Sequence, residues 1–480
     1  MKKTLLTIML FVSTLILVAC GGNGGGGSKN TISLSYADWN ADVETTELMI
    51  AAFEEEYPHI KVELRTDIGG HGEEFTNNLV DAAGAGILPD VFATDNVPVI
   101  AEKGLTLDVA PYWDADEDAK LVYEFMQKTA IYGNRRYAIP SFQFLKGIMI
   151  NLDIFENSGL KTTEGKYRFD ATTGLPVKDW TFEEFVEIAK DIKNYPGNEE
   201  TTIIGLDTWY GAPDFNQVWP MMTNPDFMYD TWDGEKFNYN SQAWIDATKV
   251  KMEVHALTDG TTVRLEEGAL ELYPYLDSYV IQSGYGAMNI EGSWQFNIIQ
   301  SAKEEGINIG FWPYPRPAEG KGEFFPPVIL DYLAISADTE YPEEAYLLGK
   351  WMSYGRDGWA KRIEIFEERR ADEEAEGIPV SLLDRYPVAN YPEIWERIDP
   401  LVEGIEGIQE TFAHIHNGKP DIDKWMPGYR DFIRWMTDPE NPHNFDAMTE
   451  QGPQTAETIA PIYNQKVNEL YKESLEQLMR

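Results

Sequence analysis

The chain has 480 residues, and its 81 Asp and Glu outnumber its 39 Lys and Arg, for a formal net charge of −42. This balance argues against nucleic acid as a partner, because the phosphates need Lys and Arg, and we interpret it as a solvated acidic surface. The single cysteine excludes an internal disulfide. The length is sufficient for two or three lobes with substantial cores.

The N-terminus is typical of an export signal. Lys2 and Lys3 precede an apolar stretch at residues 5–18 that is too short for a comfortable membrane span. The letters LVAC at 17–20 resemble the bacterial lipobox, which implies cleavage before Cys20 and lipidation of its thiol. We therefore predict a signal peptide over residues 1–19, and a lipidated Cys20 with a Gly-rich tether over residues 20–30. The alternative is an ordinary signal peptide with a cysteine nearby by chance.

Strands and helices alternate along the rest of the chain. Alternating apolar residues or short apolar runs predict strands at 32–36, 60–64, 88–93, 203–206, 286–290, 307–311 and 328–335. Helices are predicted after the first strand with Leu48, Ala51, Ala52 and Phe53 on one stripe, and at 99–103, 181–194, up to 305, 342–353 and 457–479. Thr181 and Glu184 have the spacing of a capping box. The alternation predicts an α/β fold with a largely parallel sheet.

Two segments break this rhythm. Residues 364–377 are charge-rich and are interpreted as a solvated helix face or an insertion, whereas residues 414–444 read as loop-rich with several aromatics. A calcium loop at 114–119 is rejected because it lacks the turn glycine. His414 and His416 have no third ligand nearby. We predict no metal and no cofactor.

The order of short motifs resembles the family 1 extracellular solute-binding proteins, the receptors of sugar-importing ABC transporters. The matching motifs are FEEEYP at 53–58, LPDV at 88–91, GLTLD at 104–108, YAIP at 137–140, INLDIF at 150–155, WTFEEF at 180–185, GAMNIEGSW at 286–294 and PEEA at 342–345. Each is weak alone, and their order and spacing carry the resemblance.

The resemblance implies a two-lobed periplasmic-binding-protein-like (type II) fold. Its discontinuous lobes would be joined by a hinge, with the ligand cleft between them. It places lobe 1 at residues 31–141 and 328–380, and lobe 2 at residues 142–327 and 381–480. Crossings are expected near residues 141–145 and 324–328, with a third after residues 364–377.

Sugars present apolar faces and hydroxyl rims, so a sugar receptor needs stacking aromatics beside polar side chains. By resemblance, Trp294 is the leading contact with Glu291 as a hydroxyl partner, and Trp39, Asn40, Gln143 and Phe144 lie at expected contact positions. Polar or aromatic positions after other strands add further candidates, namely Asp95, Asn96, Trp209, Tyr210, Asp214, Trp219 and Trp312, with Trp425 and Tyr429 as guesses. Trp294, Trp219 and Trp312 could instead be core residues, and Trp39, Asn40, Asp95 and Asn96 could be helix caps or loop residues.

We expect an extracellular, membrane-anchored, monomeric receptor that performs no chemistry. It would capture a carbohydrate, with an oligosaccharide favoured, and deliver it to an ABC permease on the outer face of a Gram-positive type cell membrane. One alternative is a surface-anchored glycoside hydrolase, for which two opposed carboxylates could always be found among 81 acids. Another is the same receptor binding a polyamine, metal chelate or peptide.

Overall fold

The computed structural model describes residues 31–160, 165–192, 204–206, 214–256, 280–282, 284–444 and 454–480. Its main feature is one eight-stranded sheet with the path β2-β1-β3-β9-β6-β7, to which β8 and β10 are attached. The strands are β1 (Ile32–Ala37), β2 (Ile60–Leu64), β3 (Val91–Thr94), β6 (Ile139–Asn151), β7 (Met288–Gly292), β8 (Ile309–Pro313), β9 (Pro327–Ile335) and β10 (Lys419–Pro420). A separate hairpin pairs β4 (Ile131–Tyr132) with β5 (Arg135–Arg136).

The sheet is mixed, so the prediction of a largely parallel sheet is wrong. β1 pairs in parallel with β2 and β3, and β10 with β9. The contacts β3–β9, β9–β6, β6–β7 and β6–β8 are all antiparallel. Crossover helices explain the parallel part, and the opposite direction of β9 was not visible in its apolar pattern.

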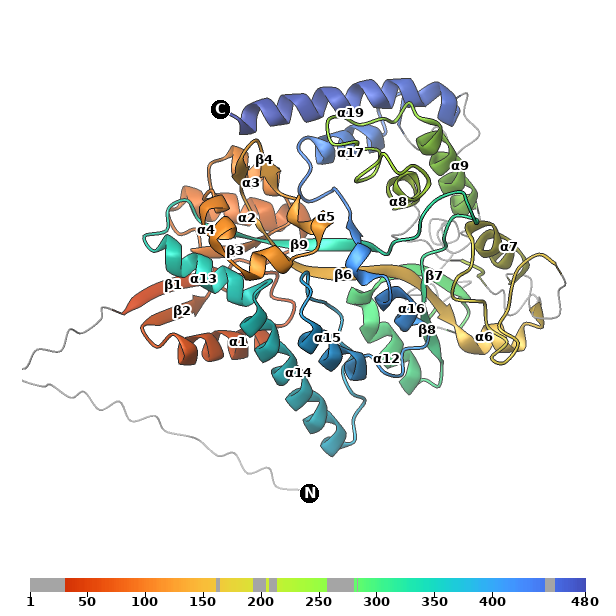
Figure 1. The fold of residues 1–480 in the computed structure, drawn as a ribbon, viewed down its shortest axis with the longest axis horizontal. Coiled ribbons are helices and arrows are strands. Elements are labelled where there is room, and N and C mark those ends of the chain that lie inside the picture. Colours follow the sequence, from red (N-terminus) through yellow and green to blue (C-terminus); the bar gives the residue numbers. More distant parts are fainter. Residues whose placement is uncertain are drawn as a thin grey trace, which may run out of the picture.

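The long strand β6 changes partners halfway along its length. Its first part, from Ile139 to Leu145, pairs with β9, with a register shift between Pro140 and Gln143. Its second part, from Lys146 to Asn151, lies between β7 and β8. In Figure 1, β6 and β9 run across the centre and connect the elements around β1 to those around β8.

Helices cover the sheet on both sides. The N-terminal ones are α1 (Val43–Glu56), α2 (Gly72–Gly84), α3 (Val97–Glu102), α4 (Ala110–Ala115), α5 (Glu124–Gln127), α6 (Leu152–Asn157), α7 (Phe182–Ile192), α8 (Asp214–Thr223) and α9 (Gln242–Ala256). The C-terminal ones are α12 (Phe296–Glu304), α13 (Pro342–Met352), α14 (Arg356–Glu376), α15 (Pro392–Ile398), α16 (Ile408–Phe412), α17 (Tyr429–Thr437) and α19 (Ala456–Leu478). Short 3-10 helices are η1 (Asp118–Leu121), η4 (Ser293–Gln295), η5 (Asp399–Leu401) and η6 (Ile415–Asn417).

Local signals predicted several helix ends correctly. The capping box of α7 is confirmed, because Thr181 N–H donates to Glu184 at 2.8 Å and Glu184 N–H donates back to Thr181 Oγ1 at 3.3 Å. The charge-rich run forms the end of α14, which stops at Gly377 with a left-handed φ of 71°.

Two other predicted segments differ from the structure. α17 lies within the segment read as loop-rich. Residue 204 makes only an isolated bridge to Gly286, not a described strand.

The predicted apolar stripe of α1 is partly wrong. Leu48 is 45% exposed, and the helix instead buries Met49, Ile50 and Phe53 against the core. The helix α2 was not predicted at all, although Phe75 and Leu79 bury its inner face. The error in α1 arises because tertiary packing, as much as periodicity, decides which face of a helix is buried.

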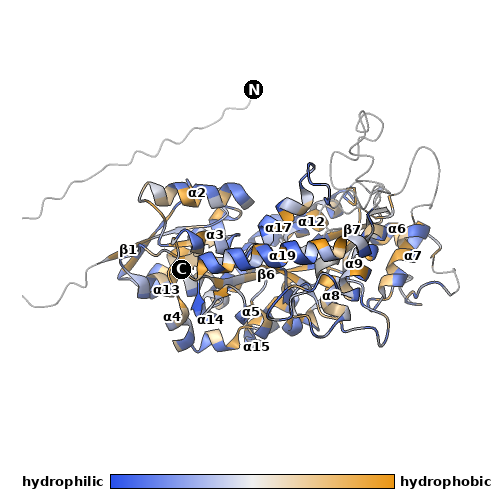
Figure 2. Cartoon of the chain, turned by 90° about the horizontal axis from the view of Figure 1, so that it is seen from above, coloured by the Kyte–Doolittle hydropathy of each residue, from blue (hydrophilic) through white to orange (hydrophobic). Residues whose placement is uncertain are grey.

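The C-terminal helix α19 lies across the top of the molecule in Figure 1. Near its end, Ser474 Oγ donates to Glu102 of α3 at 2.6 Å, and nearer its start Tyr463 packs against Trp244 of α9. Figure 2 shows hydrophilic and hydrophobic residues alternating along it, as expected for a helix with one packed face. No helix within the described ranges is long and apolar enough to cross a bilayer.

Candidate ligand cleft

The loop after β1 carries two predicted contact residues with different roles. Trp39 is half-buried, and its ring centroid lies 4.5 Å from that of Phe75. Asn40 has a φ of 55°, a left-handed conformation that Asn tolerates better than most residues. Its amide nitrogen donates to the carbonyls of Thr66 and Ile68, at 3.2 and 3.4 Å. Asn40 therefore shapes the loop, while Trp39 lines the cavity described next.

A small cavity of about 20 Å³ lies where the carboxyl ends of β1 and β3 meet the middle of β6 and β9. Its lining residues are Tyr36, Asp38, Trp39, Ala41, Asp42, Thr46, Ala93, Ser141, Phe142, Asp331, Tyr332, Leu333, Arg362 and Arg385. This volume holds about one water molecule. The carboxyl ends of strands in an open α/β sheet are where ligands usually bind, which makes this cavity the floor of the candidate cleft.

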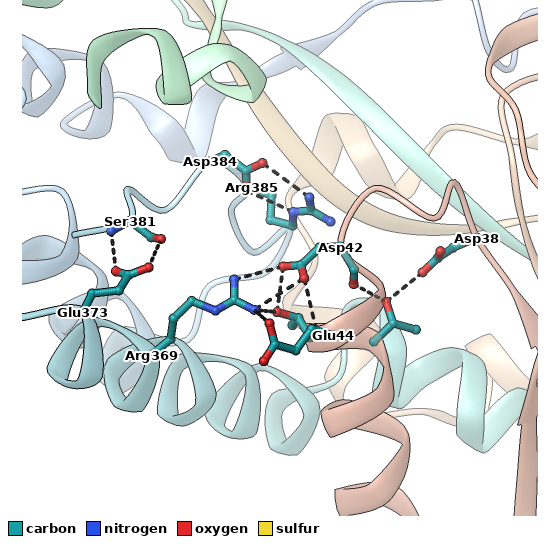
Figure 3. Close-up of polar contacts among 10 residues, drawn as sticks. Asp38, Asp42, Glu44, Arg369, Glu373, Ser381, Asp384 and Arg385 are labelled. Carbon is teal, nitrogen blue, oxygen red and sulfur yellow. Dashed lines mark hydrogen bonds and ion pairs between the residues drawn. The ribbon is translucent and has the colours of Figure 1, made fainter. Parts of the chain in front are cut away.

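Each acidic side chain of this cavity already has a protein partner. Asp38 accepts from Thr46 Oγ1 at 3.1 Å and from the Asn40 backbone at 2.9 Å. Asp331 is paired with Lys424. Asp42 caps α1 through Thr45 and receives the Arg369 guanidinium from α14 at 3.2 Å, as Figure 3 shows.

The bonds to Asp42 lower its pKa. Burial works to raise the pKa of this carboxyl, but the hydrogen bonds from Arg369 and Thr45 outweigh burial and hold it below its ordinary value. Asp42 is therefore ionised at neutral pH, and it anchors the start of α1 against α14.

A second aromatic wall follows β7. Trp294, in η4, is half-buried, and its ring meets the Phe144 ring edge-on at a centroid distance of 6.2 Å. Gly292 makes room for it, since a Cβ there would lie 1.9 Å from the Trp294 ring. The Ser293 hydroxyl fixes the turn by accepting from Leu145 N–H at 3.1 Å and donating to the Asp384 carbonyl.

Other predicted polar contacts have structural partners. Asp95 is 4% exposed and pairs with Thr76 Oγ1 at 2.7 Å and with Arg430 at 3.0 Å. Asn96 is the N-cap of α3, the alternative considered for it. Gln143 is fully buried and donates to the Pro387 carbonyl at 2.5 Å. Glu291 is 3% exposed, and one of its oxygens accepts from Gly292 N–H at 3.1 Å.

Several predicted aromatics lie in the core and not at this cavity. Trp312 is completely buried, and its indole N–H donates to the Pro176 carbonyl at 3.0 Å. It is therefore a core residue, which was the alternative to a ligand contact. Trp219 is 8% exposed and packs on Phe182. Trp425 and Tyr429 are buried beside Tyr229 and Phe237. The structure thus separates these four side chains from the half-buried Trp39 and Trp294.

Four predicted positions are not placed. Trp209, Tyr210 and Cys20 lie outside the described residues. Asp214 is described only as the first residue of α8.

Sequence reasoning missed most of the charged residues that line the cavity, among them Asp38, Arg362 and Arg385. Asp38 adjoins the predicted Trp39 and Phe142 adjoins the predicted Gln143, so neighbouring positions could have suggested them. Arg362 and Arg385 come from α14 and from the segment after it, far along the chain, and no local pattern marks them. Within the described ranges, no group of three or more His, Cys, Asp or Glu side chains is arranged to hold a metal ion.

The fold has many solved counterparts. The ABC substrate-binding protein of Listeria monocytogenes in complex with cycloalternan is 16% identical, matches 92% of this chain and 99% of its own, and superposes with a TM-score of 0.62. The cyclic alpha-maltosyl-1,6-maltose binding protein of Arthrobacter globiformis is 16% identical, with 92% and 100% of the chains matched and a TM-score of 0.61. At these identities the likeness shows the fold, which is the predicted periplasmic-binding-protein fold.

Sequence comparison identifies the family. An uncharacterized ABC transporter extracellular-binding protein of Pyrococcus horikoshii is 22% identical over 370 residues, which cover 74% of this chain and 76% of that protein. The model of the bacterial extracellular solute-binding proteins matches residues 37–353. Proteins of this family are non-catalytic, which removes the glycoside hydrolase alternative. The chain belongs to the bacterial extracellular solute-binding protein family.

Proposed function

We propose that this protein is the receptor of an ABC importer, and that it captures a carbohydrate, with an oligosaccharide favoured, and delivers it to the permease without chemistry. Membership of the solute-binding family supports capture, and the Pyrococcus relative is named as part of an ABC transporter. The Listeria protein was solved in complex with cycloalternan, and the Arthrobacter protein is named for cyclic alpha-maltosyl-1,6-maltose. Both names support a carbohydrate ligand.

The observation that carries this proposal is the pair of half-buried tryptophans at the ends of β1 and β7. Trp39 keeps part of its ring outside the core at the cavity, and Trp294 does so beside Phe144. Aromatic faces of this kind stack on the apolar faces of sugars, whereas fully buried Trp312 cannot. Trp39 and Trp294 are therefore the proposed sugar-contacting residues, with Phe144 supporting Trp294.

Capture requires the walls of the cleft to separate. A cavity of about 20 Å³ is smaller than any sugar, so ligand entry needs hinge opening. We assign residues 31–141 and 328–380 to lobe 1, and residues 142–327 and 381–480 to lobe 2. The partner change of β6 between Leu145 and Lys146 supports a boundary in this part of the strand.

Titration of the purified protein with a glycan panel tests the proposal. Isothermal titration calorimetry with mono-, di- and trisaccharides, acidic and neutral, is expected to find at least one sugar with micromolar or tighter affinity. The sugar would be recovered unchanged after overnight incubation. A panel that gives no heat, together with a thermal shift from a polyamine or peptide, would contradict the carbohydrate assignment.

The N-terminal segment is a separate part of the proposal. We infer that Cys20 carries lipid and holds the receptor on the outer face of the cell membrane, because the lipobox-like residues precede a Gly-rich tether. Replacing Cys20 by Ala is expected to move the protein from the membrane fraction to the medium. A Ser28→Ala variant in the same segment is the matched control and should stay in the membrane fraction. A Cys20→Ala protein that remains on membranes would contradict the anchor.

A further inference from the structure

Two arginines line the cavity floor and leave hydrogen-bond donors unused. Arg362 of α14 is 8% exposed, and the described residues offer it no hydrogen bond or ion pair. Its guanidinium lies over the rings of Phe142 and Trp359, at 4.8 and 5.8 Å from their centroids. A buried cation that no carboxylate contacts directly is costly to a fold, and a ligand that carries an anionic group would pair with it.

Arg385 approaches the same phenylalanine from another segment. Its guanidinium lies 5.4 Å from the Phe142 centroid and 5.7 Å from that of Phe144. Its Nε and one terminal nitrogen bond to the adjacent Asp384, at 3.0 and 3.3 Å. The other terminal nitrogen has no hydrogen-bond partner in the described part of the chain. Both guanidiniums thus lie over aromatic rings, and the N–H groups of Arg362 and one terminal nitrogen of Arg385 remain for a ligand.

Asp384 pairs with Arg385, whereas no carboxylate of the described residues hydrogen-bonds to Arg362. Asp42 is taken by Arg369 and Asp331 by Lys424, while Asp38 bonds to Thr46 and to its own loop. Burial and the charge of Arg385 together lower the pKa of Arg362 to about 10, against the opposing effect of Tyr36, Asp38 and Asp42. The buried hydroxyl of Ser141 also lines the cavity and has no partner among the described residues. Unused donors therefore converge on the cavity in a protein whose net charge is −42.

From this convergence we propose that the ligand is an acidic sugar, a uronic acid or a uronic-acid-containing oligosaccharide, whose carboxylate is bound by Arg362 and Arg385. The inference rests on the proposed carbohydrate-receptor function and specifies its substrate class. A carboxylate matches the fork of a guanidinium and accepts two parallel hydrogen bonds from it. Trp39 and Trp294 would then contact the apolar faces of the sugar rings.

Charge-matched ligands provide the direct test. Calorimetry compares D-galacturonate, D-glucuronate and their di- and trisaccharides with the methyl esters of the same compounds, which keep the shape and remove the charge. At least one uronate is expected to bind ten or more times more tightly than its ester. Its affinity should fall as NaCl rises from 50 to 500 mM. Glucose 6-phosphate tests whether any oxyanion suffices, and phosphate binding without uronate binding would overturn the proposal.

Substitutions then assign the residues. Arg362→Gln and Arg385→Gln are each expected to weaken uronate binding at least tenfold, and Arg362→Lys to restore little of it because an ammonium lacks the fork. Arg397→Gln is the matched control. Arg397 is paired with Glu367 at a distance of 2.6 Å, and neither residue lines the cavity. It should leave the affinity unchanged.

Stability separates ligand recognition from packing. If Arg362 binds the ligand and does not stabilise the fold, Arg362→Met should keep or raise the melting temperature of the free protein. The same variant should lose uronate binding. A fall in melting temperature with unchanged uronate affinity would assign Arg362 to packing and overturn the proposal. Neutral sugars or methyl esters that bind as tightly as uronates would overturn only the acidic-sugar inference. Failure of every sugar to bind would overturn the proposed function as well.

Discussion

Arg369 of α14 donates to the carboxylate of Asp42 at 3.2 Å, and Asp42 in turn caps α1 through Thr45 N–H at 3.1 Å. In Figure 3 the same helix also presents Glu373 to Ser381, where the segment leading to Arg385 begins. The charge-rich helix therefore holds two segments of the cleft floor, the β1–α1 loop and residues 381–385. It is more than a solvated face.

The Arg369–Asp42 pair predicts a pH-dependent contribution to stability. Arg369→Gln is expected to lower the free energy of unfolding by about 1 kcal/mol at pH 7, as for a partly exposed, hydrogen-bonded ion pair. The pKa of Asp42 is lowered in the folded protein, so this stability is present above the unfolded pKa and is lost as pH falls through the folded value. Urea unfolding of both proteins between pH 7 and pH 3 should show the difference shrinking below about pH 4.

Arg434→Gln is the matched control for this experiment. Arg434 pairs with Asp431 at 2.7 Å, but both side chains are at least 60% exposed. Its loss should change stability by no more than about 0.5 kcal/mol. An Arg369→Gln protein as stable as wild type at pH 7 would contradict the role given to the Asp42 pair.

Trp294 is predicted to be a binding anchor. Trp294→Ala should weaken sugar binding by about 2 kcal/mol, roughly thirtyfold in Kd, because a buried aromatic contact is lost. Calorimetry with the best sugar of the panel measures it. Trp435→Ala is the control, since Trp435 of α17 is also half-buried but packs on Phe432 of the same helix and on Tyr463 of α19. Equal affinities of wild type and Trp294→Ala would remove Trp294 from the site.

Gly292 is predicted to act only through Trp294. Its φ of −121° and ψ of 167° suit any residue, so Gly292→Ala introduces no backbone strain. The added Cβ would lie 1.9 Å from the Trp294 ring and must displace it. Gly292→Ala should therefore weaken sugar binding in wild type but cause no further loss in a Trp294→Ala background. Additive losses in the double variant would contradict this coupling.

Lys419 predicts a pH effect of the same sign as the Asp42 pair, but in an alkaline window. Its ammonium lies between the Phe125 and Phe325 rings, 4.7 and 4.5 Å from their centroids, and burial lowers its pKa to about 8. The unfolded chain then holds more protons between about pH 8 and pH 10.4, so this group makes stability rise with pH in that window. Lys419→Met should be more stable than wild type at pH 7, and the difference should narrow by pH 10. A difference independent of pH would contradict the lowered pKa.

Much of the fold was predictable because its signals are local. The reciprocal bonds of Thr181 and Glu184 form within one helical turn, and Gly377 ends α14 because glycine adopts a left-handed φ without a Cβ clash. The family resemblance was predictable for a related reason, since it depended on the order of short motifs and not on contacts between them.

The site was predictable only in part, because residues of one type have different surroundings. Trp294 and Trp312 lie within or just after apolar strands and look equivalent in the sequence. The structure leaves Trp294 half-buried after β7, whereas Trp312 of β8 is fully buried and its indole N–H donates to the Pro176 carbonyl. Which strand ends face the cleft depends on the sheet order and on the antiparallel direction of β6 and β9.

The sequence by itself therefore determined the alternation of strands and helices, several of the helix ends and the family. Only the tertiary structure brought Arg362 and Arg385 to Phe142 across more than 200 residues of chain. It also decided which carboxylates already have partners. Periodicity and capping act over a few residues, whereas the balance of charges in a cavity depends on every chain segment that lines it.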